Sequence, residues 1–355
     1  MTVGDDRRSM GDRPRPTRSA AVGLVIAIAG AGVIGYAIAR PRASPSGVHS
    51  GPLPSLPAKI AAPIRPASTD GYSVADDLAT HQIVVFGGLA DNAATWLWDG
   101  SRWTLADPKI SPPGRIDAAA AYDPVLQVVL LFGGHGPPGT DLSDTWAWGG
   151  ATWRELDKGT NQAPRSDASM AWDPALHEMV LVAGGPADTS TATWVWNNSR
   201  WTPLPSGLPA PPAAIALGFD PQTRDLIAFI HGSEAPGSAA TSRSETWAWG
   251  GAAWRRIKTR IAPQADVVVG LAWDPLSRRL LMFGGGASAF GPSRLWAWSG
   301  TDWLQLPAVQ SPPILDGRLV STDAGLFLVG ALRALAAQPG WIDVWSWSDA
   351  SWRVV

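Results

Sequence analysis

The apolar residues of this chain gather into short runs that recur about every 50 residues from residue 63 onward. In four of the six recurrences a run of small residues ends in an aromatic-Asp-Pro sequence, which is degenerate in the first and last units. A run of leucine or β-branched residues follows and ends in a glycine pair in every unit except the fourth and the sixth. A Trp-x-Trp segment, a two-residue breaker and another tryptophan complete the unit. Short apolar runs separated by turn residues predict β-strands, and the breaker predicts a hairpin. Each unit is therefore predicted to hold four strands.

Tryptophan residues mark the same position in each of these repeated units. The pattern W-x-W-x4-W occurs six times and takes 18 of the 21 tryptophans. The triads are Trp96, Trp98 and Trp103; Trp146, Trp148 and Trp153; Trp194, Trp196 and Trp201; Trp247, Trp249 and Trp254; Trp296, Trp298 and Trp303; and Trp345, Trp347 and Trp352. With Gly149-Gly150 as a type I′ turn, Trp146 is predicted to lie opposite Trp153, with all three indoles on one face. One hairpin cannot bury three indoles, so we predict that the triads are structural and pack unit against unit rather than forming a sugar-stacking platform.

A four-stranded unit repeated at this period is typical of a propeller blade. The Phe-Gly-Gly sequences at 86–88, 132–134 and 283–285, each followed by an aromatic strand and a tryptophan seven residues after its first one, resemble kelch repeats and the propeller of the galactose-oxidase-like superfamily. The resemblance covers residues 63–355 and implies an all-β, six-bladed kelch-type β-propeller. The repeats show no separate strand that would close the ring. The predicted blades are 63–107, 108–157, 158–205, 206–258, 259–306 and 307–355.

The amino-acid composition of the chain excludes several functions. The chain has no cysteine, which excludes disulfides, thiolate metal sites and the cysteine-linked tyrosine chemistry that the resemblance to galactose oxidase would otherwise imply. Its five histidines are scattered without HxH or HExxH spacing, so we predict no metal and no cofactor. A net charge of −2 with 16% charged residues gives no electrostatic footprint for nucleic acid.

The N-terminal region is predicted to be a membrane anchor. Residues 1–18 are polar and hold five arginines, and residues 19–39 are 21 uncharged residues, enough for a helix to cross a bilayer core of about 30 Å. The arginine excess predicts a cytoplasmic tail (1–18), a transmembrane signal-anchor (19–39) and an extracytoplasmic propeller, in a cell that the Ala/Arg/Trp-rich usage suggests is bacterial. The alternative is a signal peptide cleaved near Ala39, which would release a secreted protein. Residues 40–62 contain five prolines and are predicted to form an extended spacer.

The loops that follow the glycine pairs differ in length and lie on one face of the predicted propeller, where a rigid scaffold usually carries its binding residues. On this loop face, Arg115 and Asp117 occupy the same repeat positions as Arg165 and Asp167, and His135 lies in the adjacent loop. This group is expected either to bind an anionic or polar ligand at the channel mouth, or to consist of ion pairs that satisfy only one another and the backbone.

Trp341 lies outside the triads in one of the longest loops, so it is predicted to be either an anchor for a partner or a lid on the channel. No nucleophile, base and orienting group are brought together by any motif. We therefore predict a membrane-anchored, non-catalytic binding or scaffolding module with a protein or carbohydrate partner on the loop face. The alternative is an exported hydrolase or lyase that acts on a polar or carbohydrate substrate at the channel mouth.

Overall fold

The computed structural model describes the repeat region. The residues described are 65–67, 70–89, 93–137, 139–159, 167–183, 191–205, 207–208, 214–232, 243–263, 267–285, 293–307, 311–312, 314–332 and 341–355. They all belong to one compact unit, Ala61–Val355. The predicted tail (1–18), membrane span (19–39) and spacer (40–62) lie outside the described residues. Within the described ranges, no helix has the length and apolar character needed to cross a membrane.

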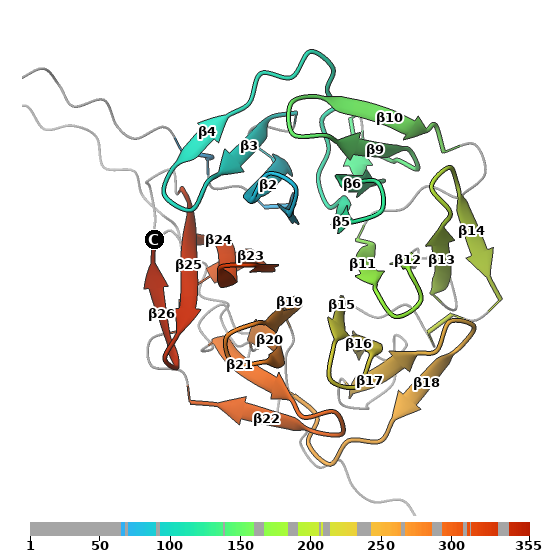
Figure 1. Cartoon of the computed structure of the whole chain (residues 1–355), viewed down its shortest axis with the longest axis vertical. Helices are drawn as coiled ribbons and strands as arrows, with labels where there is room; N and C mark the ends of the chain where they lie inside the picture. Colours follow the sequence, from blue (N-terminus) through green and yellow to red (C-terminus); the bar gives the residue numbers. More distant parts are fainter. Residues whose placement is uncertain are drawn as a thin grey trace, which may run out of the picture. The chain divides into compact units, whose positions relative to one another are not determined.

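The described residues form six four-stranded antiparallel sheets, which confirms the prediction of an all-β, six-bladed propeller. In each blade the strands follow one another in sequence from the centre outward (Figure 1). Blades one and two comprise β1 (Tyr72–Asp77), β2 (Gln82–Gly87), β3 (Thr95–Trp98) and β4 (Trp103–Leu105), then β5 (Ala119–Asp123), β6 (Val128–Phe132), β9 (Thr145–Trp148) and β10 (Trp153–Asp157). A small hairpin, β7 (His135–Gly136) and β8 (Thr140–Asp141), lies in the loop between β6 and β9.

The other four blades repeat this arrangement. Blades three and four comprise β11 (Ser169–Asp173), β12 (Glu178–Ala183), β13 (Ala192–Trp196) and β14 (Trp201–Leu204), then β15 (Ala214–Asp220), β16 (Asp225–Gly232), β17 (Arg243–Trp249) and β18 (Trp254–Ile257). Blades five and six comprise β19 (Val267–Asp274), β20 (Arg279–Gly285), β21 (Ser293–Trp298) and β22 (Trp303–Leu306), then β23 (Ile314–Thr322), β24 (Gly325–Leu332), β25 (Ile342–Ser348) and β26 (Ser351–Val354).

An aspartate caps the turn between the first two strands of a blade. In blade two, Asp123 Oδ1 accepts the backbone N–H groups of Val125 and Leu126 at 2.9 and 3.0 Å. The turn ends at Gln127, whose φ of 55° reverses the chain into the second strand. The same cap recurs at Asp173, which accepts N–H groups at 2.9 and 3.2 Å. These carboxylates are therefore structural parts of the face that carries the short turns, which we call the turn face.

The tryptophan hairpins differ from the prediction by two residues in pairing register. Trp148, and not Trp146, lies opposite Trp153. The reason is that Gly149 remains paired, with its N–H bonded to Thr152 O at 3.3 Å, and the positive φ falls at Gly150 (84°). The turn is thus centred one residue later than predicted. The three indoles still share one face, because Trp146 and Trp148 are two residues apart on β9.

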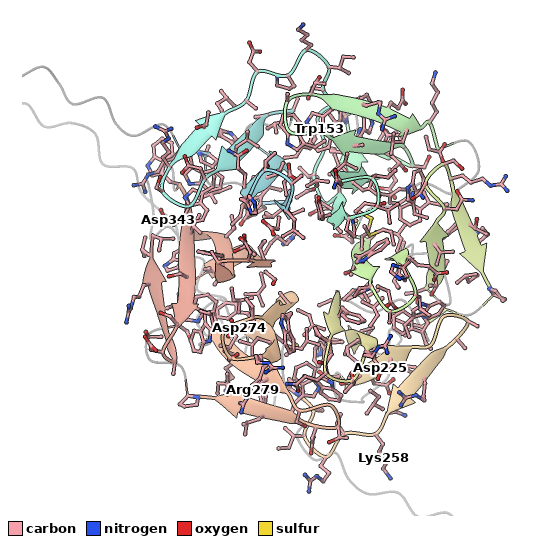
Figure 2. The ribbon with its side chains drawn as sticks, viewed as in Figure 1. Trp153, Asp225, Lys258, Asp274, Arg279 and Asp343 are labelled. Carbon is pink, nitrogen blue, oxygen red and sulfur yellow. The ribbon has the colours of Figure 1, made fainter. Side chains whose placement is uncertain are left out.

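Each tryptophan triad packs against the preceding blade. The triad of blade two lies in one buried cluster with Ala75, Val84 and Phe86 of blade one. Equivalent clusters fill the other five interfaces, and the side chains between neighbouring sheets are drawn in Figure 2. At four interfaces the third tryptophan of a triad meets a phenylalanine edge-on, as Trp201 does with Phe132, at a centroid distance of 5.5 Å. Such edge-to-face pairs add about 0.5–1.5 kcal/mol beyond area burial.

A buried hydrogen bond accompanies this packing at four interfaces within the described residues. The third tryptophan donates its indole N–H to the threonine that precedes the first tryptophan of the blade before it. The four pairs are Trp153 with Thr95 at 2.9 Å, Trp201 with Thr145 at 3.0 Å, Trp254 with Thr193 at 2.8 Å and Trp303 with Thr246 at 2.8 Å. The other two interfaces have Leu295 and Val344 in place of the threonine, so this bond is not formed there.

The ring closes where blade six meets blade one. Val320, Phe327 and Val344 of blade six pack with Tyr72 and Val74 of blade one. The segment ahead of blade one adds a short tie, because Ile342 N–H donates to Pro66 O at 3.1 Å and Ala67 pairs with Trp341. The ion pair of Arg65 with Asp343, at 3.0 Å, lies beside this tie. Closure thus combines a hydrophobic interface with a few residues that precede the first blade.

We predict that Thr145→Val destabilises the propeller by about 1–3 kcal/mol, because the substitution keeps the side-chain shape and leaves the buried Trp201 N–H without an acceptor. Chemical denaturation measures the loss. Thr104→Val on the exposed face of β4 is the control, with an expected change below about 0.5 kcal/mol. Equal effects of the two substitutions would contradict a stabilising role for the Trp–Thr hydrogen bond.

Candidate ligand-binding site

Arg115 lies on the loop face but is buried, with 1% of its surface exposed. Its guanidinium forms a bidentate pair with Asp144, at 2.6 and 2.8 Å, and donates to the carbonyl oxygens of Gly133 and Pro113 at 2.8 and 3.0 Å. Asp144 also accepts the indole N–H of Trp146 at 2.7 Å. Arg115 therefore joins the two ends of the loop between β6 and β9, and its donors are directed at the protein.

Asp117 and Asp167 are brought onto adjoining strands near the axis. Both adopt positive φ, 56° and 52°, at the loop-face end of the innermost strands of their blades. Asp117 N–H donates to Gly71 O at 2.7 Å, and Asp167 N–H donates to Asp117 O at 3.1 Å, so these backbone bonds link three blades in succession. The Asp167 side chain is exposed and Asp117 is half-buried. Arg165 lies outside the described residues.

His135 lies in the β7–β8 hairpin. Its Nδ1 contacts Asp141 Oδ1 at 2.8 Å, and its backbone exchanges two hydrogen bonds with Ile116 at 2.7 and 3.0 Å. Trp341 lies in blade six and is 44% exposed, just where the chain begins β25. The predicted group is therefore distributed: Asp117 and Asp167 adjoin, Arg115 and His135 have their own acidic partners, and Trp341 belongs to another blade.

A second cluster lies on the turn face where blade six meets blade one. Asp76 is 9% exposed, and it occupies the place that Tyr122 or another aromatic residue takes in blades two to five. Burial, followed by the nearby charges of Asp323 and Asp77, raises the pKa of Asp76 to about 7. Burial, Asp77 and Asp123 also raise the pKa of Tyr122. His81 Nδ1 contacts Asp323 Oδ2 at 2.9 Å across the same seam.

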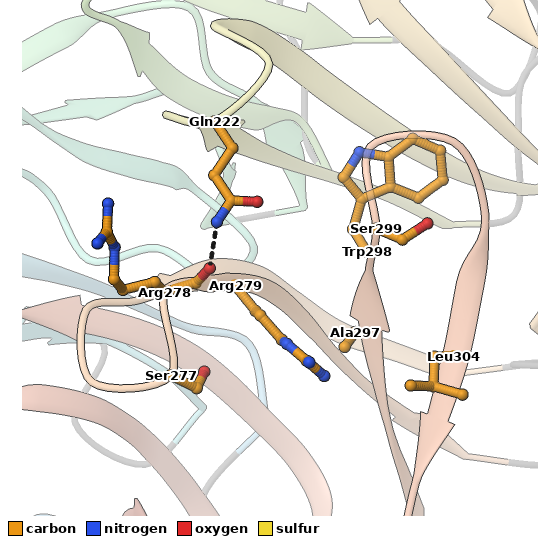
Figure 3. A pocket seen from close by; sticks show the side chains of 8 residues that line it. All are labelled: Gln222, Ser277, Arg278, Arg279, Ala297, Trp298, Ser299 and Leu304. Carbon is orange, nitrogen blue, oxygen red and sulfur yellow. Dashed lines mark hydrogen bonds between the residues drawn. The ribbon is translucent and has the colours of Figure 1, made fainter.

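The turn face also carries a cavity of about 460 Å³ where blade four meets blade five. Figure 3 shows its lining residues. They are Gln222, Ser277, Arg278, Arg279, Ala297, Trp298, Ser299 and Leu304. Gln222 Nε2 donates to Arg278 O at 2.9 Å, which ties the turn of blade four to that of blade five. The volume falls in the range of about 300–1,000 Å³ that is usual for small-molecule sites.

The cavity offers hydrogen-bond donors above an apolar wall. Arg278 and Arg279 are exposed, and the wall is formed by Ala297, Trp298 and Leu304. No acidic residue lines it. Among the residues that the structure describes, no group of three His, Asp or Glu side chains is placed to hold a metal ion. The arrangement suits a polar organic ligand whose less polar face lies on the wall.

No protein-family model matches this chain, and no curated protein matches it. Solved structures share its fold, and two of them are YjhT and the SapL1 lectin. The structure of YjhT has a TM-score of 0.54 at 12% identity, covering 82% of this chain and 98% of that one. The structure of the SapL1 lectin in complex with alpha methyl fucoside has a TM-score of 0.56 at 15% identity, covering 82% of this chain and 95% of that one. At these identities the similarity shows a common fold.

Sequence reasoning did not single out Arg278 and Arg279, because they end an Asp-Pro turn that the repeat marks as structural. A signal was nevertheless present. The position of Arg279 holds Gln82, Val128, Glu178 and Asp225 in blades one to four, so an arginine there departs from the repeat, whereas Arg278 has a counterpart in Arg224 of blade four. A departure from a periodic pattern at an exposed turn indicates a local role.

We predict that Asp76 makes the stability of the propeller fall as pH rises. The folded state keeps the proton up to a pKa of about 7, whereas an unfolded carboxyl loses it near 3.8, so stability declines between these values and levels off above them. The full effect is at most about 4 kcal/mol. Asp76→Asn should remove this decline. In urea unfolding, the stability of the variant relative to that of the wild type should therefore be higher at pH 8 than at pH 5.

Asp99→Asn is the control for this measurement. Hydrogen bonds from Ser101 lead the causes that lower the pKa of Asp99 to about 2, so its contribution is lost only as pH falls below about 4. Its effect should be the same at pH 5 and pH 8. An Asp76→Asn effect that is equally independent of pH would contradict the assignment.

Proposed function

We propose that this chain is a membrane-tethered, extracytoplasmic propeller of the kelch type that binds a carbohydrate ligand without catalysis. Residues 19–39 provide the tether and residues 40–62 the spacer in this proposal. Its kelch character is supported by the glycine pairs that end the second strands, such as Gly133-Gly134, whose φ values are 63° and 92°. The cavity where blade four meets blade five is the observation that carries the binding function.

Three properties of the cavity support a carbohydrate. The guanidinium groups, the Ser277 hydroxyl and the Gln222 amide oxygen match the hydroxyl groups of a sugar. The exposed apolar side chain of Leu304 suits the C–H face of a sugar ring. The scaffold is rigid, because Trp303 at this interface is buried and hydrogen-bonded to Thr246 at 2.8 Å. The fold similarity to a lectin in complex with alpha methyl fucoside agrees with the proposal.

The loop face, opposite the face that carries the cavity, supports an additional scaffolding role. Trp341 is exposed, its backbone pairs with Ala67, and Asp343 two residues later forms an ion pair with Arg65 at 3.0 Å. An exposed indole on a backbone that is already ordered adds little ordering cost when a partner covers it. We therefore assign the loop face around Trp341 to a protein partner.

A second candidate function is an exported hydrolase or lyase. It is favoured by Asp76, whose pKa of about 7 suits a general acid or base at neutral pH. Tyr122 lies beside it as a second proton donor. A catalytic carboxyl must reach its substrate, however, and Asp76 is only 9% exposed. We rank catalysis below binding for this reason.

We predict that intact cells displaying the full chain bind labelled oligosaccharides from a defined panel, and that external protease removes the binding. Leu304→Trp should abolish binding, because the larger side chain fills the cavity. Leu105→Trp is a matched control, since Leu105 and Leu304 are exposed leucines on the outermost strand with 51% and 52% of their surface accessible. Binding that survives Leu304→Trp would remove the cavity from the proposal, and binding that resists protease would contradict the topology.

A further inference from the structure

The charged residues lining the cavity where blade four meets blade five are both arginines. Arg278 and Arg279 are exposed, and neither guanidinium has an ion pair or a hydrogen bond within the described part of the chain. In blade four the equivalent of Arg279 is Asp225, which pairs with Arg255 at 3.7 Å. The equivalent of Arg255 in blade five is Leu304. The cross-strand charge pair of blade four is thus replaced in blade five by an arginine facing a leucine.

The carboxylate nearest to Arg278 in the sequence is that of Asp274, and it is already occupied by backbone hydrogen bonds. Asp274 is buried, and its two carboxylate oxygens accept the backbone N–H groups of Leu276 and Ser277 at 3.2 Å each. It caps the turn that carries Arg278, whose φ of 53° and carbonyl bond to Gln222 fix the backbone. The arginine side chains therefore project from a rigid turn whose own carboxylate faces the backbone.

The two arginines are not equivalent. In Figure 3, Arg279 extends between Ser277 and Ala297 across the cavity, whereas Arg278 points to the other side of the turn beside Gln222. A ligand group within the cavity would meet the Arg279 guanidinium directly, with the Ser277 hydroxyl nearby. Arg278 would contribute mainly long-range attraction from the rim.

We propose that the ligand of this cavity is an acidic saccharide, whose carboxylate or sulfate is bound by Arg279 and attracted by Arg278. This inference rests on the proposed carbohydrate-binding function and specifies its ligand class. A guanidinium offers a planar pair of N–H donors that fits either oxyanion. Without an acidic residue in the lining, the site has a net positive charge that favours an anionic ligand.

A saccharide is favoured over a nucleic acid. Nucleic-acid binding requires a basic strip that follows several phosphates, whereas this site has one arginine in the cavity and one at its rim. The chain as a whole has a net charge of −2. The outermost wall residue is Leu304, so no exposed aromatic ring is offered for base stacking.

The experiment is a calorimetric titration of the purified full chain with defined probes. The probes are a galacturonate trisaccharide, its methyl-esterified form, a sulfated disaccharide and a single-stranded oligonucleotide of matched charge. The variants are Arg279→Gln and Arg278→Gln, with Arg154→Gln as control. Arg154 is exposed on β10 of blade two, so its substitution changes the net charge equally.

We expect the acidic trisaccharide or the sulfated disaccharide to bind and the methyl-esterified form to bind at least about tenfold more weakly. Arg279→Gln should weaken binding by about 10–100-fold and Arg278→Gln by about 2–5-fold, with affinity falling as salt increases. Arg154→Gln should leave affinity unchanged. Which acidic probe binds distinguishes a carboxylate from a sulfate ligand.

Three results would overturn the inference, and they differ in what else they remove. Equal binding of esterified and acidic trisaccharides, insensitive to Arg279→Gln, would retain carbohydrate binding and reject the anionic ligand. No binding of any saccharide would reject the proposed function as well. Tighter binding of the oligonucleotide than of both acidic saccharides would replace the ligand class.

Discussion

Each blade is held to the one before it by the third tryptophan of its triad, and the other features of the propeller depend on this contact. Trp153, for example, is buried, meets Phe86 of blade one at 5.2 Å and donates its indole N–H to Thr95 at 2.9 Å. A single blade cannot bury its triad alone, so the repeated unit is stable only within the ring. The tryptophans therefore recur at a regular spacing in the sequence and lie at the interfaces between blades.

This constraint makes the departures from the repeat informative. At the seam where blade six meets blade one, Val344 replaces the threonine acceptor and Asp76 replaces the aromatic residue. The seam is instead tied by the residues around Pro66 and by the His81–Asp323 contact at 2.9 Å. In blade five, the departure at Arg279 and Leu304 leaves the core intact and changes the exposed turn face. The first departure affects closure of the ring, and the second creates a charged cavity.

The sequence alone was sufficient to predict the six blades, because the Asp-Pro turns and the tryptophan triads repeat with the same period and in a constant order. It placed the hairpin turn one residue early, because Gly149 and Gly150 are equally able to adopt positive φ and only the structure shows which one does. It could not tell a buried Arg115 from a ligand-binding one, since the partner Asp144 lies across a loop. The cavity was missed because its lining combines Gln222 of blade four with a turn and two outer strands of blade five.

The central claim is that the Trp–Thr contacts hold the blades together, so interfaces without them should open first. Hydrogen exchange of the full chain, followed by mass spectrometry, measures this directly. We predict faster exchange in β1, β24 and β25, at the seam where blade six meets blade one, than in β12, β13 and β16, whose interfaces contain the Trp201–Thr145 and Trp254–Thr193 bonds. Equal protection, or faster exchange in β12 and β13, would contradict the account.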